Sequence, residues 1–141
     1  MKGVEVKQAF VQGDDEEIIF VPFDVDPELE VTDTGMALVP GTGIPADLTG
    51  VQFRAKLKAN HDAKEAEAEI PPERWRVETR DWGVYGELPT VVGWLPNTVT
   101  QAMKALSGVY DVEAVENLGT PDEYVQKPLY GTYTLRREVT T

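Results

Sequence analysis

The clearest strand pattern in the sequence is the run Val51-Gln52-Phe53-Arg54-Ala55-Lys56-Leu57-Lys58. Apolar and polar side chains alternate along this run, and successive side chains of a strand point to opposite faces. One face is therefore apolar, from Val51 to Leu57, and the other carries Gln52 and the three basic residues. This alternation predicts a strand with one face against a core and the other in water.

Similar short runs of β-branched and aromatic residues recur along the chain. The 141 residues include 12 glycines and 10 prolines, which cut the chain into pieces mostly too short for helices. Apart from residues 51–58, we expect strands at residues 4–11, 17–25, 75–79, 84–88, 91–95, 109–115, 123–127 and 129–137. One short helix is expected at residues 98–106, where apolar residues recur at helical spacing. The Ala/Glu-rich segment 60–69 fits either a helix or a strand with small inward residues.

This pattern predicts an all-β fold. Seven to nine short strands separated by turns are typical of an antiparallel sandwich or barrel. A chain of residues 1–141 is the length of one domain, so we expect a single β-sandwich domain. Segment 26–46 contains three prolines and three glycines and is interpreted as a long loop or insertion, in which residues 36–39 can pair as a small hairpin.

The composition argues against several classes of partner. Lys and Arg number 13 against 25 Asp and Glu, which gives a formal net charge of −12. An acidic protein is a poor binder of nucleic acid or of anionic membranes, so we predict neither as a partner. We find no apolar run of about 18 residues and no secretory signal pattern. The absence of cysteine excludes disulfides and thiol chemistry, and it suits synthesis in a reducing cytoplasm.

No catalytic or metal-binding pattern is apparent, and we predict no catalytic residues, metal or cofactor. The chain has one histidine, His61, and one serine, Ser107, which lacks the flanking glycines of a nucleophile elbow. The acids at residues 14–17 alternate in direction and are interpreted as a solvated turn. The acids Asp24, Asp26 and Glu28 lack the glycine and the distant glutamate of a calcium loop.

Four aromatic residues lie close together in the sequence: Trp75, Trp82, Tyr85 and Trp94. A sugar-binding platform uses stacked aromatic rings, but core packing and subunit interfaces use the same residues more often. We therefore treat the set as a possible interface or core cluster.

Three stretches of the sequence are informative because of the order in which they follow one another along the chain. The first is Gln12-Gly13-Asp14-Asp15, and the second is Asp47-Leu48-Thr49-Gly50 before the strand at 51–58. The third starts at Thr98, passes through Ser107-Gly108-Val109-Tyr110-Asp111-Val112-Glu113 and Tyr130-Gly131-Thr132-Tyr133-Thr134-Leu135, and ends at Val139-Thr140. This order resembles small immunoglobulin-like structural proteins of tailed bacteriophages, namely the N-terminal domain of baseplate upper proteins and related short virion proteins. Residues 26–46 and 59–90 lie outside the resemblance.

The resemblance implies an immunoglobulin-like antiparallel β-sandwich with one short helix and a long Pro/Gly-rich loop. It implies a non-enzymatic protein of the virion, made in the host cytoplasm and assembled in the tail, baseplate or neck or on the capsid. Other virion proteins and copies of the same chain would be its partners, with loop 26–46 and the termini as contacts. The residues assigned to turns and structure are Gly13, Asp14, Asp47, Leu48, Thr49, Gly50, Gly108, Tyr110 and Gly131.

The chemistry of three of these residues indicates their structural roles. Glycine tolerates positive φ, so Gly50 and Gly108 are natural turn residues. Tyr110 follows a turn and begins a strand, where a tyrosine ring can pack inward and its hydroxyl can bond a backbone group, as in a tyrosine corner.

Two other functions remain open at this point. One is a carbohydrate-binding module that uses Trp75, Trp82, Tyr85 and Trp94. The other is a small jelly-roll hydrolase with acidic catalytic residues from the set Glu73, Glu78, Asp81 and Glu87, although the sequence alone pairs none of them.

Overall fold

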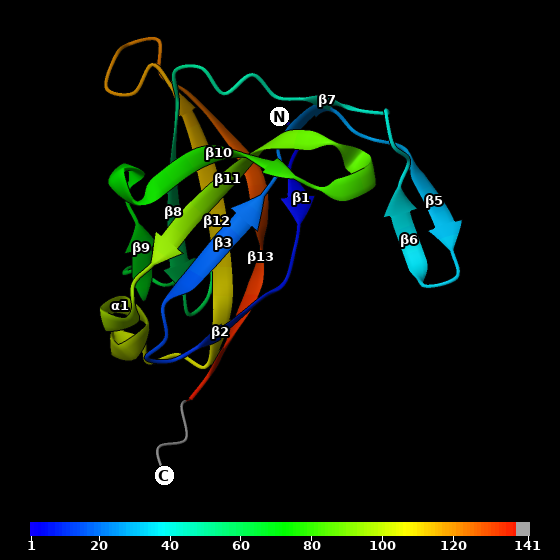
Figure 1. Cartoon of the computed structure of the whole chain (residues 1–141). Coiled ribbons are helices and arrows are strands. Elements are labelled where there is room, and N and C mark those ends of the chain that lie inside the picture. Colours follow the sequence, from blue (N-terminus) through cyan, green and yellow to red (C-terminus); the bar gives the residue numbers. More distant parts are fainter. Residues whose placement is uncertain (138–141) are drawn as a thin grey trace.

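The computed structural model describes residues 1–137, and these form mostly β structure with one short helix (Figure 1). The larger sheet has the order β9 (Ala68–Ile70), β8 (Val51–Lys58), β12 (Ser107–Glu116), β13 (Tyr124–Arg136), β1 (Val4–Glu5), and β2 (Gln8–Val11) also pairs with β13. The smaller sheet has the order β10 (Trp75–Asp81), β11 (Glu87–Leu95), β3 (Glu16–Phe20).

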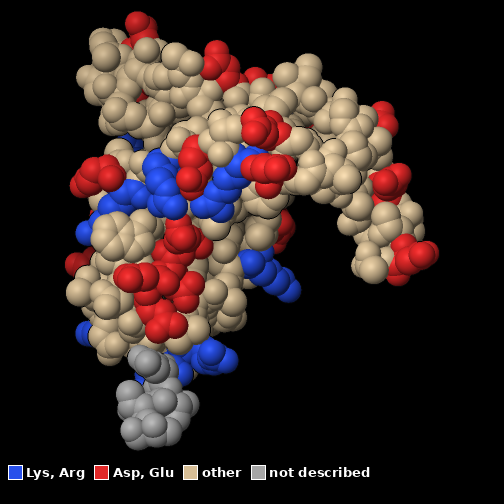
Figure 2. Space-filling model, in the orientation of Figure 1, with Lys and Arg blue, Asp and Glu red and all other residues tan. Residues whose placement is uncertain are grey.

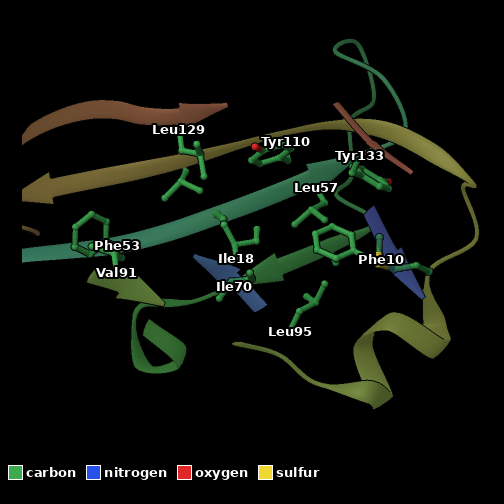
Figure 3. Packing of buried hydrophobic residues seen from close by; sticks show 14 of the residues in the cluster. Phe10, Ile18, Phe53, Leu57, Ile70, Val91, Leu95, Tyr110, Leu129 and Tyr133 are labelled. Carbon is green, nitrogen blue, oxygen red and sulfur yellow. The ribbon is translucent and has the colours of Figure 1, made fainter. Parts of the chain in front are cut away.

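The two sheets pack against each other around a buried apolar cluster (Figure 3). Ile18 and Val91 come from the smaller sheet, whereas Leu57, Val112 and Leu129 come from the larger one. The alternation of residues 51–58 is confirmed, because β8 has those bounds and every second side chain from Phe53 to Leu57 is buried. Burial of these side chains is the main favourable contribution to the fold.

The N-terminal segment departs from the antiparallel prediction. β1 and β2 run parallel to β13, whereas the other paired strands are antiparallel, so the larger sheet is mixed. The strand expected at residues 4–11 is divided at Val6, whose N–H donates to the Tyr130 carbonyl over 2.9 Å. Gly131 packs against the Val6 carbonyl at this irregularity.

Three further strands differ from their predicted bounds. The strand expected at 17–25 is divided around Pro22 into β3 and β4 (Phe23–Val25), since proline lacks the N–H that a ladder requires. The segments expected as strands at 84–88 and 91–95 instead form one strand, β11, preceded by the 3₁₀ turn η2 (Gly83–Tyr85). Gly83 and Gly86 both have positive φ there, which reverses the chain.

Segment 60–69, for which both a helix and a strand were open, forms no helix, and its end enters the strand β9. Just before β9, the Glu67 N–H donates to the Leu57 carbonyl over 2.7 Å. A short helix without an apolar face is marginal, and pairing with β8 satisfies the extended backbone instead. The helix α1 (Asn97–Ala102) ends four residues before its predicted end, and a second 3₁₀ turn, η1 (Pro72–Arg74), precedes β10.

The strands expected at 123–127 and 129–137 form the single strand β13, which continues through Pro128. The pairing with β12 shifts register between Val112 and Ala114, opposite this proline, so the missing N–H is accommodated by an irregularity. The end of the third quoted stretch, Val139-Thr140, lies outside the described residues.

Residues 23–46 form an extension that we call the arm. β4 pairs with β7 (Ile44–Pro45), and β5 (Leu29–Thr32) pairs with β6 (Gly35–Leu38). The small hairpin predicted inside loop 26–46 is therefore confirmed. Figure 1 shows this hairpin projecting away from the two packed sheets.

Candidate functional site

The hairpin β5–β6 has one apolar face. The cross-strand partners are Leu29 with Leu38 and Val31 with Met36, and partners share a face of the ribbon. The opposite face carries the alternate residues, Glu30 and Thr32 among them. Val31 is 83% exposed and Met36 is 62% exposed. The apolar face therefore lies uncovered in solvent, although an isolated hairpin of two strands is only marginally stable in water.

Local hydrogen bonds build the arm and hold its base. The Val39 N–H donates to the Glu28 carbonyl over 2.7 Å, and the Thr42 hydroxyl donates to the Val39 carbonyl over 2.6 Å. At the base, Phe23 and Leu38 line a small hollow together with Tyr85 and Leu88 of the body. The base is thus anchored beside the β10–β11 turn while the hairpin extends beyond it.

The arm carries charge of one sign. Its acids are Asp24, Asp26, Glu28, Glu30 and Asp33, and no lysine or arginine occurs between Lys7 and Arg54. Figure 2 shows red and tan atoms along the arm, with the blue atoms confined to the body. A surface that binds this hairpin has to offer apolar contact together with cations.

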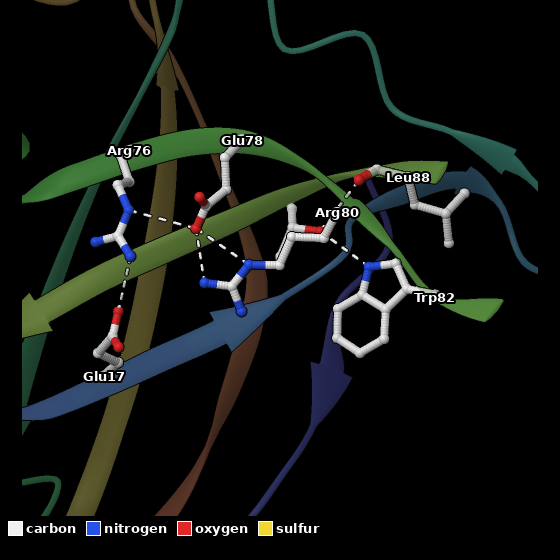
Figure 4. A network of polar contacts seen from close by, with 7 residues as sticks. Glu17, Arg76, Glu78, Arg80, Trp82 and Leu88 are labelled. Carbon is white, nitrogen blue, oxygen red and sulfur yellow. Dashed lines mark hydrogen bonds and ion pairs between the residues drawn. The ribbon is translucent and has the colours of Figure 1, made fainter. Parts of the chain in front are cut away.

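The outer face of β10 offers cations. Arg76, Glu78 and Arg80 follow one another on this face (Figure 4). The Glu78 Oε1 atom lies 2.6 Å from Arg80 Nη2 and 3.4 Å from Arg76 Nε. The hydrogen bond from Arg80 is the main cause that lowers the pKa of Glu78, so this carboxylate stays ionised. Arg76 also lies 3.1 Å from Glu17 on β3.

A hollow lined by apolar and polar residues lies at the free edge of β10, beside the first half of β8. This hollow, of about 450 Å³, is lined by Val51 and Phe53 of β8, by Pro72, and by Trp75 and Val77 of β10, with Gln52, Glu73 and Arg76 as its polar residues. Val77 is 48% exposed. Within residues 1–137, β10 pairs only with β11, so its other edge is open, and β9 pairs only with the Ala55–Leu57 half of β8.

The four aromatic residues singled out from the sequence do not form one platform. The Trp75 ring lies inside, 6.4 Å from Phe20 and 6.0 Å from Phe53 between ring centres, and its Nε1–H donates to the Ile70 carbonyl. Trp94 lies on the outer face of β11 and is 45% exposed. The 40% exposed Trp82 donates its Nε1–H to Thr90 Oγ1 over 3.0 Å, while Tyr85 lies at the base of the arm.

Two of the quoted turns are present with specific contacts. The Gly13 N–H donates to the buried Thr100 hydroxyl, which itself donates to the Asp14 carbonyl over 2.7 Å, so this turn is attached to α1. In the other turn, the Asp47 carboxylate accepts the Thr49 N–H over 3.0 Å, which lowers the pKa of Asp47. Leu48 packs against the core, and Gly50 has φ 73°.

Gly108 is not a turn residue, and that interpretation was wrong. Gly108 lies inside β12, where a Cβ would collide with the Lys58 carbonyl and the Tyr133 ring, so the reason for glycine is close approach. Gly131 lies inside β13 against Val6.

Tyr110 has the geometry expected of a structural tyrosine. Its ring is buried, and its hydroxyl donates to the Val6 carbonyl over 2.6 Å while accepting from Gln8 Nε2 over 3.2 Å. Burial raises the pKa of Tyr110, with the hydrogen bond from Gln8 acting in the opposite direction.

The acidic residues around the start of β3 each make a separate structural contact. Asp15 accepts from the Asn97 N–H, Glu16 accepts from the Val11 N–H, and Glu17 pairs with Arg76. Among residues 1–137, no three His, Asp or Glu side chains gather in a way that could hold a metal ion.

The carboxylates considered for a hydrolase are also dispersed. Glu78 is held between two arginines, and Glu73 lies in η1 before β10. Asp81 is directly opposite Glu87 at the far end of β10, and its carboxylate accepts the Gly83 N–H over 2.8 Å. Of the helices in the part of the chain that the structure describes, none is long and apolar enough to cross a bilayer.

No protein-family model matches the chain, and no curated protein sequence matches it. The alternation Leu29-Glu30-Val31-Thr32 is the sequence signal for the amphipathic hairpin, and our sequence reasoning did not use it. The open edge of β10 has no such local signal, because it depends on which strands become neighbours.

Proposed function

We propose that this chain is a non-enzymatic structural protein of a tailed bacteriophage virion, which assembles by protein contacts in the tail, baseplate or neck or on the capsid. The observation that carries the proposal is the uncovered apolar face of the hairpin β5–β6, with Val31 83% exposed. An apolar surface of this kind is characteristic of a protein contact site.

The strand order supports an immunoglobulin-like sandwich. In that fold, strands B, E and D share one sheet and strands C, F and G share the other. If these strands are lettered in their order along the chain, β3, β8, β10, β11, β12 and β13 become B, C, D, E, F and G. The smaller sheet then contains B, E and D, and the larger sheet contains C, F and G, as in the immunoglobulin fold. The arm then occupies the connection between strands B and C. This agreement, together with the order of the three quoted stretches, favours the phage family.

The direct test is the protein content of purified particles of the phage whose genome encodes the chain. Mass spectrometry of gradient-purified virions should find the chain at a constant ratio to the tail or capsid proteins. A host cytoplasmic enzyme, measured in the same fractions, controls for contamination. If the chain is lost with the host enzyme during purification, the proposal is overturned.

A carbohydrate-binding function is the second candidate, and exposed tryptophans favour it. Trp82 and Trp94 lie on the outer side of the smaller sheet, and the bond from Trp82 to Thr90 holds that ring in place. Glycan binding that is lost on Trp82→Ala, with the fold intact, would support this candidate. Trp75→Phe is the matched control, because Trp75 packs inside and should not affect a sugar on the outer face.

A further inference from the structure

We propose that the hairpin of one copy docks on the open edge of β10 in a second copy, so that β5 lies beside β10 and the smaller sheet grows by two strands. This inference rests on the proposed function, since it names the partner of the same arm.

The backbone of both elements is available for such pairing. β10 is seven residues long, and within residues 1–137 no strand pairs with the edge opposite β11. β5 pairs only with β6 in the same part of the chain, so its outer edge is also open. Exposed strand edges pair readily with strands of another chain, and main-chain hydrogen bonds then supply affinity.

The side chains match on the inner side of the sheet. Leu29 and Val31 lie on the apolar face of the hairpin, and Met36 and Leu38 lie beside them on β6. The inner side of β10 presents Trp75 and Val77 above the 450 Å³ hollow. A hairpin placed at this edge with its apolar face inward would continue the apolar interior between the two sheets and cover the exposed half of Val77.

The side chains also match on the outer side. With Leu29 and Val31 inward, the alternation of a strand turns Glu30 outward. The outer side of β10 carries Arg76 and Arg80, which pair with Glu78 and, for Arg76, also with Glu17 of β3, so Glu30 would join an existing network of ion pairs. Opposite charges on neighbouring strands stabilise their pairing. In this one orientation, Leu29 and Val31 contact the apolar side chains of β10, and Glu30 lies on the side of its arginines.

Charge and geometry favour a head-to-tail contact, in which the hairpin of one copy binds the β10 edge of another copy, over a contact between two hairpins. Pairing of two arms with each other would bring Glu28, Glu30 and Asp33 against the same three acids, which opposes that arrangement, whereas Asp24 and Asp26 already pair with the N-terminal ammonium and with Lys2. The arm's own base is anchored near Tyr85 and Leu88, and the hairpin projects away from its own body (Figure 1). A contact between two different surfaces of the same chain produces rings or filaments of copies.

The first experiment measures self-association by sedimentation equilibrium over a range of concentrations. The wild-type chain should form dimers and larger species, and Val31→Glu or Val77→Glu should weaken association at least tenfold. The Val31→Glu variant keeps an intact β10 edge, and the Val77→Glu variant keeps an intact hairpin. An equimolar mixture should therefore form heterodimers through this one pair of intact surfaces, and nothing larger. Leu106→Glu is the matched control, since Leu106 is 51% exposed at the other end of the molecule. Circular dichroism checks that each variant is folded.

The second experiment uses the absence of cysteine from the chain. A mixture of the Val31→Cys and Val77→Cys variants should form a disulfide-linked dimer under mild oxidation, whereas Val31→Cys mixed with Leu106→Cys should not. A disulfide requires Cα atoms within about 7 Å, so its formation shows that position 31 of one copy lies beside position 77 of another, as docking of β5 on β10 requires. Equal cross-linking in both mixtures would contradict the docking geometry.

The outcomes separate this inference from the proposed function. A wild-type chain that is present in virions but stays monomeric at all concentrations overturns the docking between copies and leaves the structural role standing, with another virion protein as the partner of the arm. A chain that self-associates through Val31 and Val77 but is absent from particles supports the docking and overturns the virion role.

Discussion

The Tyr110 hydroxyl donates a 2.6 Å hydrogen bond to the carbonyl of Val6, which lies 104 positions earlier in the chain. Val6 lies between β1 and β2, where the N-terminal segment leaves the regular ladder with β13. One buried side chain of β12 thus satisfies a backbone group at the irregular edge of the sheet, and this links the N-terminal strands to the core.

We predict that Tyr110→Phe destabilises the protein by about 1–3 kcal/mol, because the Val6 carbonyl loses its side-chain donor in a partly buried place. Urea denaturation measures the free energy of unfolding, and hydrogen exchange should show the largest loss of protection at residues 4–11. Tyr133→Phe is the matched control: the Tyr133 hydroxyl is buried without a hydrogen-bond partner within residues 1–137, so its removal should be nearly neutral. Equal losses in the two variants would contradict the role of the Val6 contact.

Alkaline pH should destabilise the fold through the same two tyrosines. Burial is the first cause that raises the pKa of both Tyr110 and Tyr133 above the ordinary value near 10. When the pKa is raised in the folded state, the contribution of the neutral tyrosine to the free energy of unfolding is fully present below about pH 10. This contribution is lost as the pH rises toward the pKa of the folded state. Tyr133→Phe should therefore lose less stability between about pH 9 and pH 11 than the wild type. An unchanged pH profile would show that Tyr133 does not contribute.

Gly108→Ala should destabilise the fold by about 1–3 kcal/mol or more, since the added methyl group meets the Lys58 carbonyl and the Tyr133 ring inside the sheet. Thermal unfolding measures the effect. Ser107→Ala is the neighbouring control, because Ser107 is exposed and its change should shift the melting temperature little. A melting temperature in Gly108→Ala equal to that of the control would show that the sheet relaxes around the new group.

Replacement of residues 29–37 by a short Gly-Ser linker, which keeps Leu38 at the base of the arm, should leave the melting temperature of the body almost unchanged. The hairpin contributes no residue to the buried core cluster, and the hydrogen bond between the Val39 N–H and the Glu28 carbonyl holds the ends of the removed segment together. Circular dichroism with thermal unfolding provides the measurement. A large fall in melting temperature would mean that the hairpin stabilises its own body, which contradicts the description of the arm as an extension.

Local sequence patterns predicted the elements in which the spacing of apolar side chains reflects which face is buried. Strand β8 was predicted with its bounds and its buried face, because alternation along eight residues directly reflects a sheet with one dry side. The arm was predicted as a Pro/Gly-rich loop with a hairpin for a similar local reason. Segment 60–69 was ambiguous, since its alanines and glutamates fit both periods, and pairing with β8 decided the outcome.

What the sequence determined by itself is therefore the β character of the chain, the position of its best strands and the acidic charge of its arm. Only the tertiary structure decided that β1 and β2 run parallel to β13, that Gly108 is needed for close approach, and that Tyr110 reaches Val6. It also decided that the edge of β10 stays open beside a hollow lined by apolar and polar residues. The physical reason is that these features depend on contacts between residues far apart in the chain, and such contacts leave no periodic trace in either segment alone.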